Sequence, residues 1–207
     1  MKIKICGITS IHDAMTACAY GADALGFVFY RKSPRYISPE NAKAIIERIP
    51  AFVATVGVFV DEDIERMDAV IGLTGIDYAQ LHGNEPASTV HRLGRKAIKA
   101  FRIKDESSIA QVNGSGLDTV LLDGFTDIYG GAGKGFDHGL LKDVSKSIRV
   151  ILAGGITPEN VVETVREYGP YAIDVSSGVE SSPGKKSEEK LRLLFERIRA
   201  CGPGQNT

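Results

Sequence analysis

The first side chain that could do chemistry is a cysteine at the end of a short predicted strand. Apolar and basic residues alternate over residues 2–5, which predicts a strand, and Cys6 and Gly7 follow it directly. Gly7 can bend the chain, and Thr9 or Ser10 can cap a helix that begins next. An α/β protein often places reactive groups at such a position, but cysteine is also among the most buried residue types. This segment alone therefore leaves open both a reactive thiol and a thiol buried in the core.

Polar and glycine residues, together with Cys6, recur at or just after the ends of the predicted strands. These positions are Cys6, the loop 31–35, Asp61, Gln80, His82, Arg102, Asp123, Gly154, Gly155, Asp174, Ser176, Ser177 and Gly178. The strands themselves are mostly apolar. If the strands are parallel and form one barrel, their carboxyl ends meet on one face, where such barrels carry their active sites.

The elements that would position these residues alternate regularly. The predicted strands are 2–5, 24–29, 53–60, 78–81, 97–101, 119–123, 149–153 and 171–175. Helical patterns follow these strands at 11–20, 38–49, 63–73, 105–112, 140–147 and 187–200. Two further helices are predicted to begin at residues 84 and 157. Eight strand–helix units predict a single (β/α)₈ TIM barrel over residues 1–207, with 201–207 as a frayed tail. An open doubly wound sheet is the alternative fold.

Composition narrows the classes of function. The 207 residues include 25 basic and 26 acidic side chains, a net charge of −1, so no overall field attracts nucleic acid or an anionic membrane. Three cysteines are too few and too scattered for a disulfide framework, and the four histidines show no ligand spacing, so we expect no metal. No signal region or membrane-spanning run is present. We expect a soluble cytoplasmic protein without nucleic-acid or membrane partners.

Two loops predict a phosphate site. Gly154 and Gly155 follow the seventh predicted strand, and Ser176, Ser177 and Gly178 follow the eighth. In this fold the loops after strands seven and eight often bind phosphate through backbone N–H groups. These residues could instead be plain turn residues, but both loops carry the signal, which favours a phosphorylated small-molecule substrate.

The glycine-rich segment 130–135 is not a nucleotide-binding Walker A loop. Ile128 stands where that motif needs its first glycine, and Gly135 follows Lys134 where it needs Ser or Thr. We interpret the segment, with Gly131, Gly133 and Lys134, as a mobile lid near Asp123. Lys134 could close onto an anion or remain a solvated lysine.

Cys6 and Asp123 could form an acid/base pair across the barrel mouth, with a thiolate taking a proton and a carboxylic acid giving one. A turn aspartate is the plainer interpretation of Asp123. Arg35 suits a substrate carboxylate because its guanidinium binds one in bidentate fashion, although the 31–35 loop could simply be solvated. His82 could be structural; we expect it, with Gln80, to line the site.

These segments together resemble the phosphoribosylanthranilate isomerase family over residues 2–186. The segments are Lys4-Ile5-Cys6-Gly7-Ile8-Thr9, Gly26-Phe27-Val28-Phe29, Ser33-Pro34-Arg35-Tyr36-Ile37, Gln80-Leu81-His82-Gly83, Leu121-Leu122-Asp123, Gly130-Gly131-Ala132-Gly133-Lys134, Ala153-Gly154-Gly155-Ile156 and Asp174-Val175-Ser176-Ser177-Gly178-Val179-Glu180. The resemblance implies a cofactor-free isomerase of tryptophan biosynthesis. It would convert N-(5-phosphoribosyl)anthranilate to 1-(2-carboxyphenylamino)-1-deoxyribulose 5-phosphate by an Amadori rearrangement.

The resemblance also implies roles for individual residues. Asp123 would protonate the ribose ring oxygen, and Cys6 would remove the C2′ proton. Arg35 would hold the anthranilate carboxylate, and Asp174 would contact sugar hydroxyls. The loops at 154–155 and 176–178 would hold the phosphate. A thiol suits the role of base because its ordinary pKa of about 8.5 lies within reach of neutral pH.

Two positions depart from the family pattern. His138 stands where the family usually has tryptophan, and Ala153 replaces a frequent serine. Two rival functions are a related histidine-pathway isomerase, which would have aspartate in place of Cys6, and a non-catalytic phosphate-binding barrel, which would not need both Cys6 and Asp123. Both a monomer and a homodimer remain open.

Overall fold

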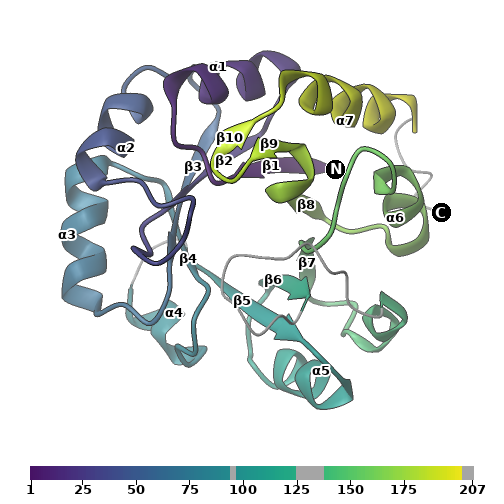
Figure 1. The fold of residues 1–207 in the computed structure, drawn as a ribbon. Helices are drawn as coiled ribbons and strands as arrows, with labels where there is room; N and C mark the ends of the chain where they lie inside the picture. The colour runs from purple at the N-terminus through teal and green to yellow at the C-terminus, as the bar shows by residue number, and fades with distance from the viewer. Residues whose placement is uncertain (94–96, 125–137, 202–207) are drawn as a thin grey trace.

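The computed structural model describes residues 1–93, 97–124 and 138–201, which form a closed barrel of eight parallel strands. Each strand pairs with the next along the chain, and the eighth pairs with the first, as Figure 1 shows. The strands are β1 (Lys2–Cys6), β2 (Ala24–Val28), β3 (Ala54–Phe59), β4 (Tyr78–Leu81), β5 (Ala97–Ile103), β6 (Thr119–Gly124), β7 (Arg149–Leu152) and β8 (Ala172–Val175). The predicted (β/α)₈ barrel is confirmed, and the open sheet is wrong.

Helical segments follow the strands and surround the barrel (Figure 1). They are α1 (Ile11–Tyr20), α2 (Pro39–Ile46), α3 (Ile64–Thr74), α4 (Ser88–Arg92), α5 (Glu106–Asn113), the 3₁₀ segment η1 (His138–Asp143), α6 (Val161–Tyr168), the short η2 (Ser177–Val179) and α7 (Glu188–Ala200). Local signals set several helix starts. The side chains of Ser10 and Ser38 accept hydrogen bonds from the backbone N–H groups of Asp13 and Asn41, which caps α1 and α2.

One predicted helix is of another type, and two others begin later than predicted. The helix expected over 140–147 is instead the 3₁₀ segment η1. The helix expected from residue 157 begins at Val161, because the Asn160 side chain holds the preceding loop through the N–H of Thr157 and the carbonyl of Gly155. The helix expected from residue 84 begins at Ser88. Before it, the Glu85 carboxylate accepts hydrogen bonds from nearby backbone N–H groups, which keeps this segment a loop.

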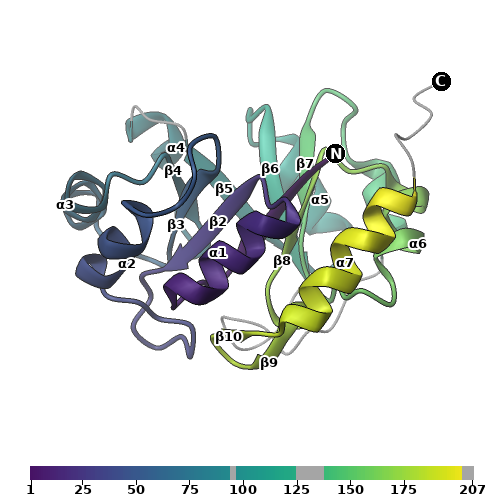
Figure 2. The same ribbon diagram turned by 90° about the horizontal axis from the view of Figure 1, so that it is seen from above.

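An antiparallel hairpin after β8 was not predicted. It consists of β9 (Glu180–Ser182) and β10 (Lys185–Lys186). Figures 1 and 2 place the hairpin beside β1 and β8, at the end of the barrel where these strands finish. It therefore contributes to the face expected to carry the active site.

The apolar core has two layers. Small and branched side chains fill one side of the barrel interior: Ile98, Ala100, Leu121, Ile151, Ala153 and Ala172. A larger layer packs the outer faces of the strands against the helices, with members such as Leu25, Phe27 and Leu194. Alternation along each strand thus separates the residues of the barrel interior from those under the helices.

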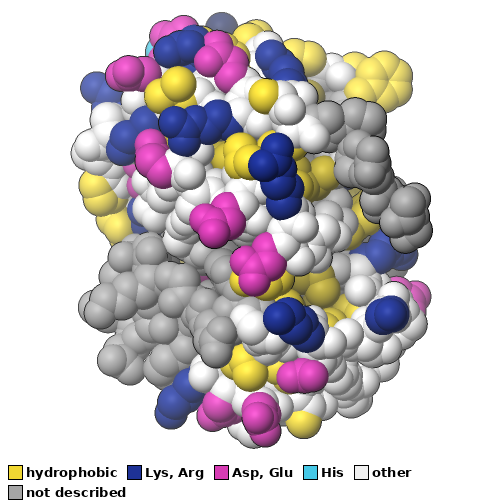
Figure 3. All heavy atoms as spheres, turned by 90° about the vertical axis from the view of Figure 1, so that its right-hand side faces the viewer, with side chains coloured by type: hydrophobic (Ala, Val, Ile, Leu, Met, Phe, Trp, Pro, Cys, Tyr) yellow, Lys and Arg dark blue, Asp and Glu magenta, His cyan; other side chains and the backbone are white. Residues whose placement is uncertain are grey.

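The outer surface mixes charges of both signs. Figure 3 shows interspersed acidic and basic side chains on the face that carries α6 and the C-terminal end of α7. In the part of the chain that is described, no helix has both the length and the apolar character needed to cross a membrane.

Candidate active site

Cys6 lies inside the barrel at the C-terminal end of β1. Ile3 and Ile5 pack in the layer under the helices, so the alternate residues Lys4 and Cys6 face the barrel interior. Cys6 pairs with Gly26 in the β1–β2 register. A Cβ on Gly26 would lie 2.7 Å from Sγ of Cys6 and 3.0 Å from Cε of Lys4, so glycine leaves the space that these side chains fill.

Two ammonium groups act on the Cys6 thiol. Burial and the negative charge of Asp174 raise its pKa, whereas the positive charges of Lys4 and Lys186 lower it, and the pKa is raised overall. Lys186 donates to the backbone carbonyl of Cys6 at 2.5 Å and to that of Ser176 at 3.3 Å. The thiolate form thus depends on cations from β1 and from the hairpin.

Asp123 lies near the end of β6 with 27% of its side chain exposed, the more open of the two proposed acid/base groups. Its Oδ2 is 3.2 Å from Nε2 of His82. A Cβ on Gly154 would lie 2.8 Å from its Oδ1, so this oxygen lies beside the loop that follows β7. Asp123 therefore stands between His82 and a predicted phosphate loop.

A row of polar side chains leads from the buried Asp174 to the partly exposed His82. The ammonium of Lys4 donates to Oδ2 of Asp174 and to Oε1 of Gln80, both at 2.8 Å. Nε2 of Gln80 is in turn 2.8 Å from Nδ1 of His82. Burial lowers the pKa of Lys4, but the negative charges of Asp174 and Cys6 outweigh it and raise the pKa overall.

Asp174 has an unusual environment among these groups. It is 7% exposed, and its Oδ1 finds no hydrogen-bond partner within the described parts of the chain. Buried polar atoms are rarely left unsatisfied, so this oxygen is suited to accept a hydrogen bond from a ligand.

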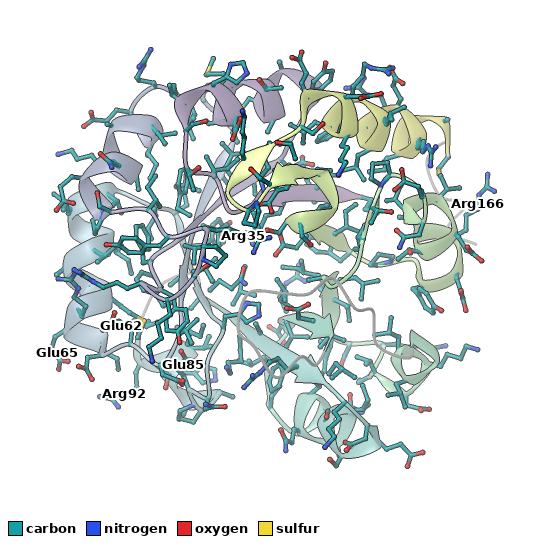
Figure 4. All side chains as sticks on the ribbon, viewed as in Figure 1. Arg35, Glu62, Glu65, Glu85, Arg92 and Arg166 are labelled. Carbon is teal, nitrogen blue, oxygen red and sulfur yellow. The ribbon has the colours of Figure 1, made fainter. Side chains whose placement is uncertain are left out.

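Arg35 is held by a carboxylate from the hairpin. Its Nε and Nη2 donate to both oxygens of Glu180, at 2.6–3.2 Å, and both residues are 6% exposed. Figure 4 shows Arg35 over the central part of the barrel, beside the hairpin. Lys186 adds a third charge, 2.8 Å from Oε1 of Glu180. Burial alone would raise the pKa of Glu180, but the hydrogen bonds from Arg35 and the charge of Lys186 lower it.

The two predicted phosphate loops lie against each other. Gly154 and Gly155 have φ values of +87° and +68°, which glycine adopts without strain. Asn160 holds their loop through Gly155, and a Cβ on Gly178 would overlap the carbonyl oxygen of Ile156. The backbone of the β8 loop thus approaches that of the β7 loop closely.

The structure gathers most of the predicted site residues at one end of the barrel. Cys6, Arg35, Gln80, His82, Asp123, Gly154, Gly155, Asp174, Ser176, Ser177 and Gly178 all occur at or just beyond the C-terminal ends of strands. Gln80 is buried at 1% exposure, with both ends of its amide bound to protein groups. Gly131, Gly133 and Lys134, the predicted lid, lie outside the described residues. The roles assigned to individual residues stay predictions.

Sequence reasoning missed three charged residues of this region: Lys4, Glu180 and Lys186. The signal for Lys4 was its position two residues before Cys6, which puts both side chains on one face of β1. Glu180 and Lys186 gave no such signal, because the hairpin that carries them was not predicted. In the described part of the chain, no group of three His, Cys, Asp or Glu side chains is arranged to hold a metal ion.

Comparisons with known proteins show the family of this chain. The family model described as N-(5'-phosphoribosyl)anthranilate (PRA) isomerase matches residues 3–197. The N-(5'-phosphoribosyl)anthranilate isomerase of Trichlorobacter lovleyi is 44% identical over 201 residues, covering 96% of this chain and 98% of the relative.

Solved structures give the same result. The phosphoribosyl anthranilate isomerase of Thermus thermophilus aligns with a TM-score of 0.89 at 42% identity, covering 97% of this chain and 99% of that one. A phosphoribosyl anthranilate isomerase in complex with reduced 1-(o-carboxyphenylamino)-1-deoxyribulose 5-phosphate aligns with a TM-score of 0.86 at 36% identity, again covering 97% and 99%. By sequence and by fold, this chain belongs to the phosphoribosylanthranilate isomerase family.

Proposed function

We propose that this protein isomerises N-(5-phosphoribosyl)anthranilate to 1-(2-carboxyphenylamino)-1-deoxyribulose 5-phosphate, a step of tryptophan biosynthesis. The observation that carries the proposal is the placement of Cys6 and Asp123 at the mouth of one barrel, at the ends of β1 and β6. Family membership supports it, as does the relative that binds a reduced form of the proposed product. The reaction needs no cofactor, and we place it in the cytoplasm.

The rearrangement divides into two proton transfers. Asp123 gives a proton to the ribose ring oxygen, the bond from that oxygen to C1′ breaks, and the anthranilate nitrogen forms a Schiff base with C1′. Cys6 then removes the C2′ proton as a thiolate, and the electron pair moves through C1′ to the nitrogen to give an enolamine. Loss of the enol proton and uptake of a proton at C1′ give the ketone, so no atom is gained or lost overall.

The two groups suit these opposite roles. A thiol is a better base near neutral pH than an ordinary carboxylate, because its pKa lies closer to that range. Lys4 and Lys186 offset part of the rise that burial and Asp174 cause in the pKa of the Cys6 thiol. Asp123 is partly exposed and points one oxygen toward the β7 loop, where a substrate held by its phosphate can approach.

The remaining site residues would bind the ends of the substrate. Arg35 would meet the anthranilate carboxylate, and Glu180 holds its guanidinium in place for this contact. Asp174 would accept a sugar hydroxyl at the oxygen that lacks a partner within the described residues. Backbone groups of the loops at 154–155 and 176–178 would bind the phosphate. All these residues come from one chain, so a single protomer can contain the complete site.

The test is loss of substrate fluorescence on turnover by the purified protein. The parent is expected to turn over N-(5-phosphoribosyl)anthranilate, and Cys6→Ser and Asp123→Asn are each expected to lose about 10²-fold or more in kcat. Cys18→Ser is the matched control, because Cys18 lies half-buried in α1, on the outside of the barrel. A parent without turnover would refute the substrate assignment. Full activity in either site variant would refute the role of that residue.

A further inference from the structure

We infer that a row of positioning residues, two of them buried, fixes which oxygen of Asp123 carries its proton. The row consists of Lys4, Gln80 and His82, and it ends on Oδ2 of Asp123. This inference rests on the proposed function, because it concerns the group proposed as the general acid. In this inference, Gln80 and His82 are positioning residues that orient the carboxyl group of Asp123.

Lys4 sets the direction in which hydrogen bonds are donated along the row. An ammonium group only donates hydrogen bonds, so the Gln80 atom that faces Lys4 at 2.8 Å must be the amide oxygen. The amide nitrogen of Gln80 must then face His82, 2.8 Å from Nδ1. The donor-only ammonium of Lys4 thus decides which end of the Gln80 amide is the oxygen and which is the nitrogen. Asp174 keeps the lysine in place through its own bond at 2.8 Å.

The amide nitrogen in turn decides the state of the imidazole. An NH₂ group donates, so Nδ1 of His82 must accept and carries no proton. His82 is therefore neutral, and its single N–H is on Nε2. This N–H points at Oδ2 of Asp123 across 3.2 Å, so His82 is a hydrogen-bond donor to the carboxyl group.

A donor on Oδ2 leaves Oδ1 as the oxygen that carries the acid proton. Oδ1 lies beside Gly154, where a Cβ would approach it to 2.8 Å, on the side of the predicted phosphate loop. The proton that opens the ribose ring thus leaves from the oxygen that faces this loop. The carboxylate formed keeps the N–H of His82 on its other oxygen, and no rotation of the side chain is needed between the two states.

The tautomer of His82 can be measured directly by NMR on protein labelled with ¹⁵N-histidine. The chain has four histidines, so His82→Asn identifies the His82 signals by their loss. The parent is expected to show a neutral ring protonated at Nε2. A ring protonated at Nδ1, or at both nitrogens near neutral pH, would overturn the inference.

Replacing the amide tests the direction of the row. In Gln80→Glu the new carboxylate can only accept, so Nδ1 must gain a proton, and His82 between two carboxylates is expected to become doubly protonated. A charged imidazolium beside Asp123 favours the ionised carboxylate, which cannot act as an acid. We expect kcat to fall about 10²-fold with KM within about twofold of the parent. An unchanged tautomer, or a rise in KM with unchanged kcat, would overturn the inference.

A second pair of variants guards against simple misfolding. Gln80→Met removes the amide without adding charge and is expected to lower kcat about tenfold, with the two tautomers of His82 mixed. Thr74→Val is the matched control, because it removes a buried hydrogen bond, to the carbonyl of Val70, within α3. It is expected to lower stability and leave kcat unchanged. An equal loss of kcat in both variants would overturn the inference.

The two proposals fail separately. A parent that turns over the substrate while His82 carries its proton on Nδ1 would refute the positioning role and leave the function intact. A parent with the Nε2–H ring but no turnover would refute the proposed function and, with it, the role of the row in catalysis.

Discussion

Lys186 donates a hydrogen bond from its ammonium group to the backbone carbonyl of Cys6, with 2.5 Å between Nζ and O. The two residues are 180 positions apart in the chain. The same ammonium binds the carbonyl of Ser176 and the carboxylate of Glu180. The hairpin that follows β8 thus ties the strand that carries the proposed base to a predicted phosphate loop.

Replacing Lys186 is expected to shift the pH dependence of catalysis. Its charge lowers the pKa of the Cys6 thiol against the effect of burial. Lys186→Met should therefore raise that pKa further, so the rise of kcat/KM with pH should occur at higher pH than in the parent. At neutral pH the loss should be about tenfold or more, since less thiolate is present.

The matched control for this variant is Lys185→Met, one residue earlier and exposed. It is expected to keep the parental pH profile. Lys186→Arg keeps the charge and should restore most of the profile if the protein folds. An unshifted profile in Lys186→Met, in a protein that unfolds cooperatively, would show that the charge does not act on the thiol.

Glu180 should make stability depend on acid pH. Burial raises the pKa of its carboxyl group, but Arg35 and Lys186 lower it below the ordinary value of 4.5. A group whose pKa is lower in the folded state contributes stability above its unfolded pKa and loses it as pH falls through the folded pKa. The parent should therefore lose part of its unfolding free energy below about pH 4.5.

Glu180→Gln removes this contribution. It should cost about 3–5 kcal/mol at neutral pH, because two buried cations lose the negative charge that they share. Its stability should also fall less steeply in acid than that of the parent. Urea unfolding between pH 3 and pH 7 measures both effects, and Glu196→Gln is the control, because its pair with Arg192 is exposed on α7. Equal acid slopes in the parent and Glu180→Gln would contradict the prediction.

The parts of the fold that local sequence determines were predictable. Alternation and apolar runs located all eight strands, and the capping serines at 10 and 38 located two helix starts. The predicted start at residue 157 failed because the side chain of Asn160 binds the backbone of that segment in place of a helical turn. A local pattern cannot reveal which side chain will take the backbone N–H groups of a loop.

The candidate site was predictable where one strand end carries one functional group, as for Cys6, His82 and Asp123. It was not predictable where function depends on pairs far apart in the chain. Arg35 and Glu180 are separated by 145 positions, and Lys4 and Asp174 by 170. Which charges meet depends on barrel register and on a hairpin of only a few residues. The buried charges that surround the proposed base therefore emerge only in three dimensions.

Gly26 should be required for the position of the base. A Cβ there would lie 2.7 Å from Sγ of Cys6 and 3.1 Å from its Cα, which forces the thiol or the strand to move. Gly26→Ala is expected to lower stability by about 1–3 kcal/mol through overpacking. It should lower kcat about 10²-fold, because a small displacement of a reacting group has effects of that size.

Gly72→Ala is the matched control for this substitution. Gly72 lies in α3, and a Cβ there meets no atom within 4 Å. Alanine at that position should stabilise the protein by about 0.5–1 kcal/mol through helix propensity and leave kcat unchanged. Thermal unfolding and steady-state kinetics on both variants test the pair. Parental kcat in Gly26→Ala would show that the thiol tolerates displacement.

Asn160 should be required for binding of the substrate phosphate. Its side chain donates to the carbonyl of Gly155 and accepts from the N–H of Thr157, both at 2.8 Å, and so fixes the loop after β7. Asn160→Ala should loosen this loop and raise both KM and the inhibition constant of inorganic phosphate about tenfold. Because the loop does not carry the acid or the base, kcat should stay within about threefold of the parent.

Asn113 supplies a matched control, since it makes the same two kinds of bond at the C-terminal end of α5. Its side chain donates to the carbonyl of Asp143 at 2.9 Å and accepts from the N–H of Ser145 at 2.8 Å. These bonds brace the segment that leads into β7, at the opposite end of that strand from Gly155. Both alanine variants should lose about 1–2 kcal/mol of stability, but only Asn160→Ala should weaken inhibition by phosphate. Equal inhibition of the two variants by phosphate would show that the loop after β7 does not bind the anion, whatever the stabilities of the variants.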